Sequence, residues 1–87
     1  MELKDKVAVI TGGSGGIGQA MAKAFLQQGA TAVVLADLSA AAVAAAAAAL
    51  GCDAEVCDVT NEAQVAAVVE RTLAKYGRID LFCSNAG

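Results

Sequence analysis

A glycine-rich segment at residues 11–18, TGGSGGIG, is the feature that most restricts how this chain can fold. Five of its eight residues are glycine, which reaches backbone conformations with positive φ that other residues avoid. An apolar run at residues 7–10, rich in β-branched side chains, precedes it. Apolar residues at helical spacing follow it, namely Ile17, Met21, Ala24 and Phe25. The segment is therefore predicted to be a tight turn from a buried strand into an amphipathic helix.

The remaining sequence repeats this alternation of strand and helix. Further strands are predicted at residues 32–36, 55–59 and 79–83, the first of them continuously apolar. Gly29 is suited to end the first helix in a left-handed conformation. The pattern is typical of a parallel sheet with crossover helices.

Two more helices are predicted between these strands. Ser39 is suited to cap a helix that Gly51 ends, although residues 40–49 are all alanine except Val43. Asn61, with Gln64 three residues on, resembles a capping box for a helix that ends at Gly77. The expected buried positions are Val43, Ala46, Ala47 and Leu50 in one helix, and Val65, Val68, Val69, Leu73 and Tyr76 in the other.

These elements predict a single α/β unit with no internal linker. Right-handed crossovers would carry the first three strands outward, and the fourth would return beside the first. The expected fold is a Rossmann-type, doubly wound parallel sheet of order 3-2-1-4, which stops after its fourth strand. Ligands bind such sheets where the strand order reverses, between the carboxyl ends of strands one and four.

The glycine turn lies at that edge and is suited to a dinucleotide pyrophosphate. Glycines at 12, 13, 15, 16 and 18 remove side chains from the path of a phosphate. A helix that begins near Gly16 presents free amides and the positive end of its dipole. The position of the motif, after a predicted strand and before a predicted helix, supports this interpretation.

Asp37, at the end of the second strand, narrows the choice of dinucleotide. An acid here can accept hydrogen bonds from the adenosine ribose hydroxyls. A carboxylate about 4 Å from a 2′-phosphate would be repelled by up to ~4 kcal/mol per unit charge at an effective dielectric of about 20. The neighbours Ser14, Gly15, Leu38 and Ser39 carry no positive charge to offset this. The predicted cofactor is therefore NAD in preference to NADP.

Two other polar side chains, those of Asp58 and Tyr76, have a structural as well as a functional interpretation. Asp58 and Val59, after the third strand, could bind the adenine, or Asp58 could simply begin the turn before Asn61; the spacing fits both. Tyr76 has Asp80 rather than lysine four residues on, and it fits an apolar helix stripe, so it is predicted to be a core residue.

Charge and composition limit which binding partners and which cellular compartment are expected. The net charge is −3 with no basic cluster, which argues against nucleic acid and anionic membranes as partners. No apolar run approaches the roughly 20 residues of a membrane span, and no leader is expected in residues 1–6. Three cysteines without CxxC spacing, and no histidine, predict free thiols and no metal site. We therefore expect a cytoplasmic protein.

With these residues in place, the chain resembles the N-terminal part of a short-chain dehydrogenase/reductase. Thr11-Gly12-x-x-x-Gly16-Ile17-Gly18 matches the cofactor motif of that family, and Asp37 matches its NAD-selecting acid. Asp58-Val59 matches the pair at the adenine pocket. Asp80 and Asn85-Ala86-Gly87 match the motif of the fourth strand, with Ser84 where asparagine is frequent.

The resemblance implies hydride transfer between NAD and a small-molecule alcohol or ketone in a longer, homo-oligomeric protein. The catalytic serine, Tyr-x-x-x-Lys pair and further asparagine of the family would follow residue 87, so no catalytic residue is predicted in this chain. Residues 1–87 would be the NAD-binding half-domain. The expected cofactor-binding residues are Gly12, Ser14, Gly15, Gly16, Ile17, Gly18, Asp37, Leu38, Asp58, Val59, Asn85, Ala86 and Gly87.

Two alternatives belong to other functional classes. A complete, non-catalytic nucleotide-binding module would leave the fourth strand as an open apolar edge, which favours self-association. An S-adenosylmethionine-dependent methyltransferase also has a glycine turn and an acid after its second strand. The three-residue gap between Gly12 and Gly16, and the Asn-Ala-Gly after the fourth strand, argue against the methyltransferase.

Overall fold

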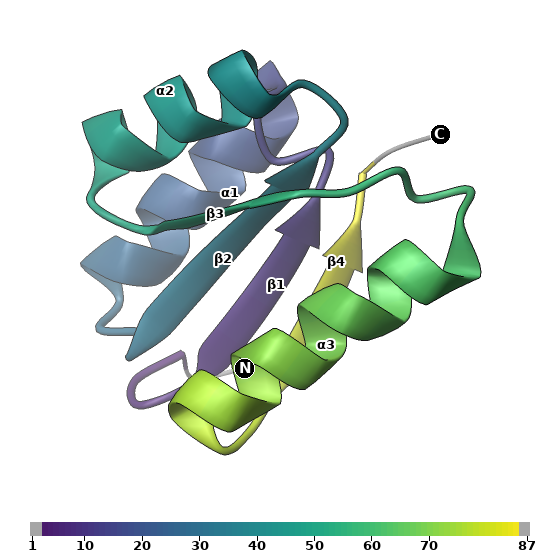
Figure 1. Ribbon diagram of the computed structural model, residues 1–87. Coiled ribbons are helices and arrows are strands. Elements are labelled where there is room, and N and C mark those ends of the chain that lie inside the picture. Colours follow the sequence, from purple (N-terminus) through teal and green to yellow (C-terminus); the bar gives the residue numbers. More distant parts are fainter. Residues whose placement is uncertain (1–2, 86–87) are drawn as a thin grey trace.

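A computed structural model describes residues 3–85 of the chain. Its four strands are parallel and lie in the order β3-β2-β1-β4, which confirms the predicted α/β doubly wound sheet (Figure 1). The strands are β1 (Val7–Thr11), β2 (Ala32–Asp37), β3 (Asp53–Val56) and β4 (Leu81–Ser84). The helices that alternate with them are α1 (Gly16–Gln27), α2 (Ala40–Leu50) and α3 (Glu62–Tyr76).

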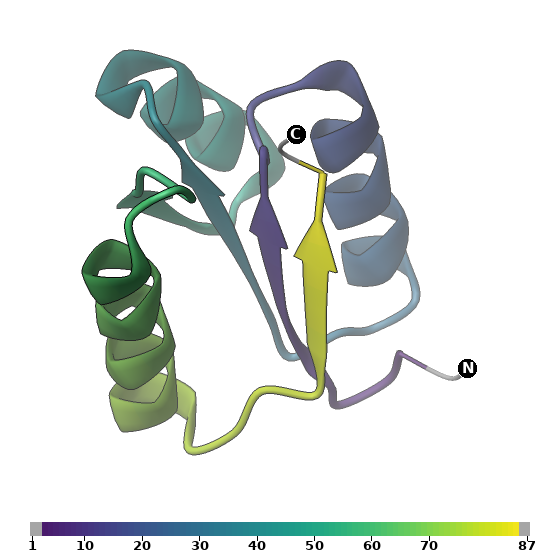
Figure 2. The ribbon, with the colours of Figure 1, turned by 90° about the vertical axis from the view of Figure 1, so that its right-hand side faces the viewer.

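The helices cover the two faces of the sheet unequally. Helices α1 and α2 lie on one face, and α3 lies alone on the other (Figures 1 and 2). The two central strands, β1 and β2, are buried along almost their whole length, as their continuous apolar sequences predict. The sheet therefore has a fully enclosed centre and two more exposed edge strands.

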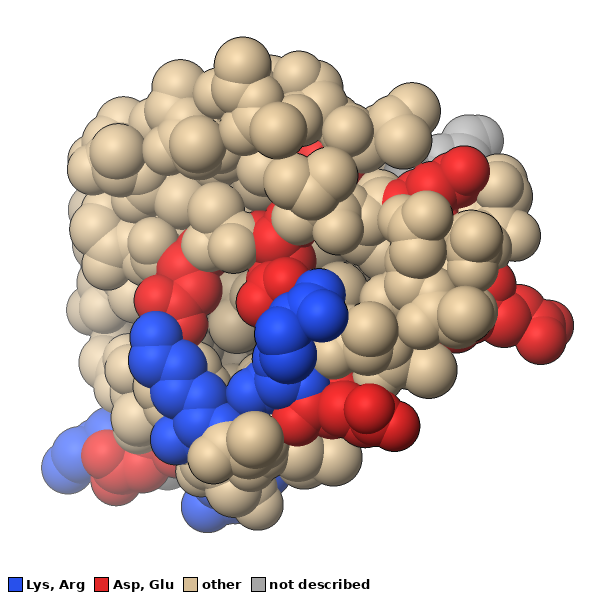
Figure 3. All heavy atoms as spheres, viewed as in Figure 1, with Lys and Arg blue, Asp and Glu red and all other residues tan. Residues whose placement is uncertain are grey.

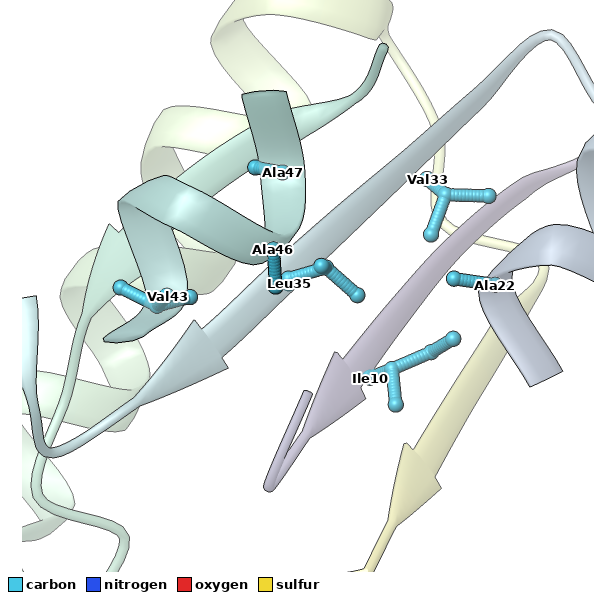
Figure 4. Packing of buried hydrophobic residues seen from close by; sticks show 7 residues of the cluster. All are labelled: Ile10, Ala22, Val33, Leu35, Val43, Ala46 and Ala47. Carbon is cyan, nitrogen blue, oxygen red and sulfur yellow. The ribbon is translucent and has the colours of Figure 1, made fainter. Parts of the chain in front are cut away.

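Side chains alternate between the two faces of β1 and β2 and form two separate cores. The larger core lies under α1 and α2 (Figure 4) and consists of Ile10, Ala22, Val33, Leu35, Val43, Ala46 and Ala47. The smaller one lies under α3 and consists of Val9, Val34, Ala36, Cys57 and Val68. Small alanines on α2 let that helix approach the sheet closely, which explains how an alanine-rich segment contributes to a core.

The predicted helix ends are confirmed at α2. The Ser39 hydroxyl accepts a hydrogen bond from the amide of Ala42 at 3.2 Å, and Gly51 ends the helix at φ 73°. Val43, Ala46 and Ala47 are buried as expected, and Leu50 packs against the same core. Local sequence signals therefore determine this helix well.

The ends of α3 are also as predicted, with one change in the cap. The Asn61 side chain accepts from the Gln64 amide at 3.1 Å, and Gly77 ends the helix at φ 78°. The Gln64 side chain, however, accepts from the amide of Asp58 at 2.8 Å rather than from that of Asn61. The cap thus also ties the helix to the loop that precedes it.

Two residues on the predicted apolar faces of the helices are exposed in the structure. Ile17 is 72% exposed and Leu73 is 43% exposed. Ile17 lies in the first turn of α1, beyond the part of the helix that covers the sheet. On α3 the buried line runs instead through Val68 and Thr72, whose hydroxyl donates to the Val68 carbonyl at 2.8 Å. This hydrogen bond within the helix satisfies the hydroxyl of the buried threonine.

Two strand boundaries also differ from the expectation. β3 covers Asp53–Val56 rather than residues 55–59, and β4 covers Leu81–Ser84 rather than 79–83. Pairing decides these limits, since Asp53 lies opposite Val34 and Val56 lies opposite Asp37, the last residue of β2. Cys57 remains buried, and its amide donates to the Asp37 carbonyl at 2.8 Å.

Exposed ion pairs join α3 to the edge strand β3. Arg71 pairs with Glu55 at 2.6 Å and Lys75 pairs with Asp53 at 3.0 Å, where acidic and basic side chains meet in Figure 3. Tyr76 packs against the smaller core, as predicted, and its hydroxyl also donates to Asp53. Exposed pairs of this kind contribute little stability each, so they orient α3 more than they hold it.

Candidate cofactor site

The glycine turn is folded back against the end of β2. Gly12 has φ 68°, a left-handed conformation that favours glycine. The amide of Gly13 donates to the Ala36 carbonyl at 3.2 Å, and the amide of Gly15 donates to the Gly12 carbonyl at 3.2 Å. The turn therefore has a defined shape, held by its own backbone and by the neighbouring strand.

Three glycines in this turn have different surroundings. A Cβ atom on Gly18 would lie 2.5 Å from the Gly12 carbonyl oxygen and 2.8 Å from the Gly13 Cα. A Cβ on Gly13 would lie 2.8 Å from the Leu35 Cβ. A Cβ on Gly16, by contrast, would have no heavy atom within 4 Å among the described residues. Gly13 and Gly18 are thus required by packing, whereas the absent side chain at Gly16 leaves open space at the helix start.

Unpaired amides surround that open space. The first helical hydrogen bond of α1 runs from the Gln19 amide to the Gly15 carbonyl at 2.9 Å. The amides of Gly16, Ile17 and Gly18 precede it and have no partner within the helix. They point along the helix axis at the positive end of its dipole. This arrangement suits a phosphate group.

Asp37 borders the turn and is hydrogen-bonded to it. One carboxylate oxygen, Oδ2, accepts from the Ser14 amide at 3.0 Å and from the Ser14 hydroxyl. The other oxygen, Oδ1, accepts from the Leu38 amide at 2.8 Å. These hydrogen bonds, chiefly that of the Ser14 hydroxyl, lower the pKa of Asp37 against the opposing effect of desolvation. Asp37 is therefore ionised at neutral pH.

The Asp58 side chain is hydrogen-bonded within its own turn. Its Oδ1 atom accepts from the amide of Thr60 at 2.9 Å and from the Thr60 hydroxyl at 2.6 Å, and these bonds lower its pKa. Of the two roles that the sequence left open, the turn-forming one is therefore supported by contacts. The adenine-binding role remains a prediction, since Asp58 and Val59 lie in the loop after β3 at the same edge of the sheet.

The end of β4 joins the other side of the site. The Asn85 amide donates to the Thr11 carbonyl at 3.2 Å, and its side-chain amide donates to the Met21 sulfur at 3.3 Å. Asn85 thereby links the start of the glycine turn to α1. Ala86 and Gly87, which are also expected to border the cofactor, lie outside the described residues.

Asp80 fixes the other end of the same strand pair. Its Oδ2 atom accepts from the Val7 amide at 2.8 Å, and its own amide donates to the Val7 carbonyl at 2.8 Å. Arg78 pairs with the carboxylate at 2.6 Å and, as the largest cause, lowers its pKa. Asp80 therefore has a structural role far from the carboxyl ends of the strands.

Apolar side chains stand exposed around the same edge. Ile17 and Leu38 are 72% and 68% exposed, and Val59 is also exposed. Ile17 lies in the first turn of α1, and Leu38 and Val59 lie in the loops after β2 and β3, so all three are at the carboxyl-terminal edge of the sheet. Exposed apolar side chains beside polar groups are typical of a binding site.

Sequence reasoning placed Ser14 at the site but missed its bond to Asp37. The two residues are 23 positions apart, and only the parallel pairing of β1 with β2 brings them together. The chance of such a contact could have been inferred from the strand order, but not its geometry.

Within residues 3–85 no three His, Cys, Asp or Glu side chains are grouped as metal ligands. No helix in that range is both long and apolar enough to cross a membrane.

The turn, the acid at the end of β2 and the sheet order define a Rossmann-type nucleotide-binding unit. Residues 6–87 match the family described as short chain dehydrogenase, and the chain belongs to this family.

Relatives of known activity share this region. The chain is 43% identical to the (+)-cis,cis-nepetalactol synthase of Nepeta racemosa, with 99% of this chain and 33% of the relative covered. It is also 43% identical to the mitochondrial (-)-isopiperitenol/(-)-carveol dehydrogenase of Mentha piperita, with 99% and 34% covered. The chain thus spans about a third of the length of the curated relatives it matches.

Solved structures of the family contain the same arrangement. The 3-ketoacyl-(acyl-carrier-protein) reductase of Brucella melitensis, complexed with NADH, superposes with a TM-score of 0.86 at 40% identity, over 92% of this chain and 34% of that one. An NAD+-bound xylitol dehydrogenase superposes with a TM-score of 0.88 at 34% identity, over 100% and 35% of the two chains. The family fold therefore binds a nicotinamide cofactor.

Proposed function

We propose that residues 1–87 are the NAD-binding N-terminal portion of a longer single-domain oxidoreductase. In that protein, hydride would pass between NAD and a small-molecule alcohol or ketone. The observation that carries the proposal is an ionised Asp37 beside a glycine turn whose helix amides are free. The names of the relatives, which include dehydrogenases and reductases, support the reaction class.

Each part of the site has a distinct role in this proposal. The amides of residues 16–18 would bind the pyrophosphate, and Asp37 would accept hydrogen bonds from the adenosine ribose. The exposed Leu38 and Val59, with Asp58, would border the adenine. Gly12, Gly15 and Ile17, together with residues 85–87, would complete the cofactor-binding surface. The nicotinamide, when bound, supplies or accepts the hydride.

The distribution of charge favours NAD over NADP. Lys4 and Lys6 precede β1, and Lys23 lies in the second half of α1. Arg71, Lys75 and Arg78 lie on or after the C-terminal half of α3. None of the six basic residues lies in the turn after β1 or in the loops after β2 and β3, and Arg71 and Lys75 are paired with Glu55 and Asp53 of β3. A 2′-phosphate beside Asp37 would have no basic partner in this chain.

The groups that move the substrate proton are expected elsewhere in the protein. Tyr76 is not a candidate, because it packs against the smaller core and donates to Asp53. Free thiols at Cys52, Cys57 and Cys83 support a reducing, cytoplasmic location. Assembly into a homo-oligomer would use surfaces beyond the four strands described above.

Calorimetric titration of the purified protein with NAD, NADP and S-adenosylmethionine tests the proposal. NAD should bind at least ten times more tightly than NADP, and S-adenosylmethionine should not bind. Tighter binding of S-adenosylmethionine than of NAD would favour a methyltransferase instead. Failure of every nucleotide to bind would refute the proposed site.

A further inference from the structure

The Asp37 carboxylate is already largely occupied by hydrogen bonds from its own chain. A carboxylate has about four acceptor positions, two on each oxygen. Both positions on Oδ2 are taken by the Ser14 amide and the Ser14 hydroxyl. The Leu38 amide takes one position on Oδ1. One acceptor position, on Oδ1, is therefore free for an incoming hydroxyl.

Ser14 is itself held firmly on both sides. Its carbonyl accepts from the Gln19 side chain, on α1, at 2.7 Å. The preceding residue, Gly13, donates to the Ala36 carbonyl of β2 at 3.2 Å. The backbone around Ser14 is thus held between α1 and β2 by contacts that do not involve Asp37.

Ser14 is also the single residue with a side chain in the segment from Gly12 to Gly16. Its hydroxyl is directed at Asp37 and at no other acceptor in the described residues. The orientation of the carboxylate at the edge of the site therefore depends on one hydroxyl and two backbone amides.

We propose that Ser14 is a positioning residue that fixes the Asp37 carboxylate with Oδ1 turned toward the ribose, and thereby sets the preference for a ribose diol over a 2′-phosphate. This inference rests on the proposed function. Without the Ser14 hydroxyl the carboxylate could rotate, and the diol would have to order it on binding. A carboxylate that is free to rotate would also repel a 2′-phosphate less strongly, because it would spend less time close to it.

The neighbouring charged groups do not offer another cause for the orientation. The turn, the end of β2 and the start of α2 contribute no titratable side chain other than Asp37 itself. The loop after β3 contributes Cys57, whose thiol pKa is raised by burial, and Asp58, which is bonded to Thr60. The hydrogen bonds from Ser14 are therefore the specific feature to remove.

The binding test compares Ser14→Ala with Ser14→Thr, which retains a hydroxyl. Ser14→Ala should weaken NAD binding about tenfold, equivalent to ~1.4 kcal/mol, and NADP binding much less, so that the ratio of the two dissociation constants shrinks. Ser14→Thr should restore NAD affinity to within about threefold of wild type. In an Asp37→Asn background, Ser14→Ala should have little further effect, because its role acts through Asp37.

Three results would overturn the inference. These are an unchanged NAD to NADP ratio in Ser14→Ala, an equal loss in Ser14→Ala and Ser14→Thr, and a full additional loss in the Asp37→Asn background. Urea unfolding of each variant separates these effects from misfolding. If Ser14→Ala does not fold, Ser14→Cys replaces it, since a thiol is a weak donor. Wild-type selectivity in Ser14→Cys would then overturn the inference.

A measurement without cofactor separates this inference from the proposed function. Carbon-13 NMR of the side-chain carboxyls in the unliganded protein should show a higher pKa for Asp37 in Ser14→Ala, with Asp80 unchanged as an internal control. An unchanged Asp37 titration would refute positioning by Ser14 even if NAD binds. A wild-type protein that shows the Asp37 shift but binds no NAD would refute the proposed function alone.

Discussion

Replacement of Gly18 by alanine tests the packing of the glycine turn most sharply. The new Cβ would lie 2.5 Å from the Gly12 carbonyl oxygen and 2.8 Å from the Gly13 Cα. Both are backbone atoms, so no side-chain rotation can relieve the overlap, and α1 must move away from the turn. Overpacking of this kind costs roughly 1–3 kcal/mol. Alanine regains up to about 1 kcal/mol through helix propensity, so we expect a net loss of about 1–2 kcal/mol.

Gly16→Ala is the matched control in the same helical turn. Its Cβ would meet no atom within 4 Å in the described structure. The free energy of unfolding should therefore stay unchanged or rise by up to about 1 kcal/mol. NAD binding should nevertheless weaken, because the methyl group enters the space beside the free amides of the helix start.

Urea unfolding followed by circular dichroism measures both variants, and calorimetry measures their affinity for NAD. A loss of about 1–2 kcal/mol is a measurable share of the roughly 5–15 kcal/mol that stabilises a typical folded domain. The reasoning would be refuted if both variants changed stability equally, or if Gly16→Ala bound NAD as tightly as wild type.

Three further predictions concern single side chains. Asp37→Ala should weaken NAD binding by about 1.5–3 kcal/mol and reduce the preference for NAD over NADP. If calorimetry shows unchanged affinities for both cofactors, Asp37 serves only to form the turn. Ser39→Ala should destabilise the protein by about 1 kcal/mol through loss of the α2 cap, and Ser39→Asp should not; equal urea midpoints would contradict the cap. The pKa of Asp80 is lower in the folded than in the unfolded chain. The ionised carboxylate therefore stabilises the fold above about pH 4, and this stabilisation is lost as the pH falls through the pKa of the folded chain. Asp80→Asn should therefore reduce the loss of stability on acidification, and an unchanged pH profile would argue against the Val7 contact.

Much of the fold could be predicted because its signals are local. Ser39 and Gly51 mark the ends of α2 through contacts within a few residues. The alternation of predicted strands and helices, together with the rule that crossovers are right-handed, predicts the strand order. The glycine turn was likewise identified from its place between a strand and a helix. Such features depend on backbone conformation, which a short segment specifies by itself.

The errors arose where distant segments decide the outcome. The limits of β3 depend on its register with β2, and the exposure of Leu73 depends on how far α3 overlies the sheet. Ile17 follows the helical period of α1, yet it lies beyond the covered face. At the site, the bond from Ser14 to Asp37 joins residues on two loops, so no local pattern indicates it.

The central claim is that the free amides at the start of α1 bind the pyrophosphate of NAD. Amide NMR spectra of the protein, recorded during titration with NAD and separately with adenosine, test it directly. The resonances of Gly16, Ile17 and Gly18 should shift strongly with NAD and little with adenosine, which has no phosphate. If NAD binds while these three resonances stay in place, the pyrophosphate lies elsewhere and the account is wrong.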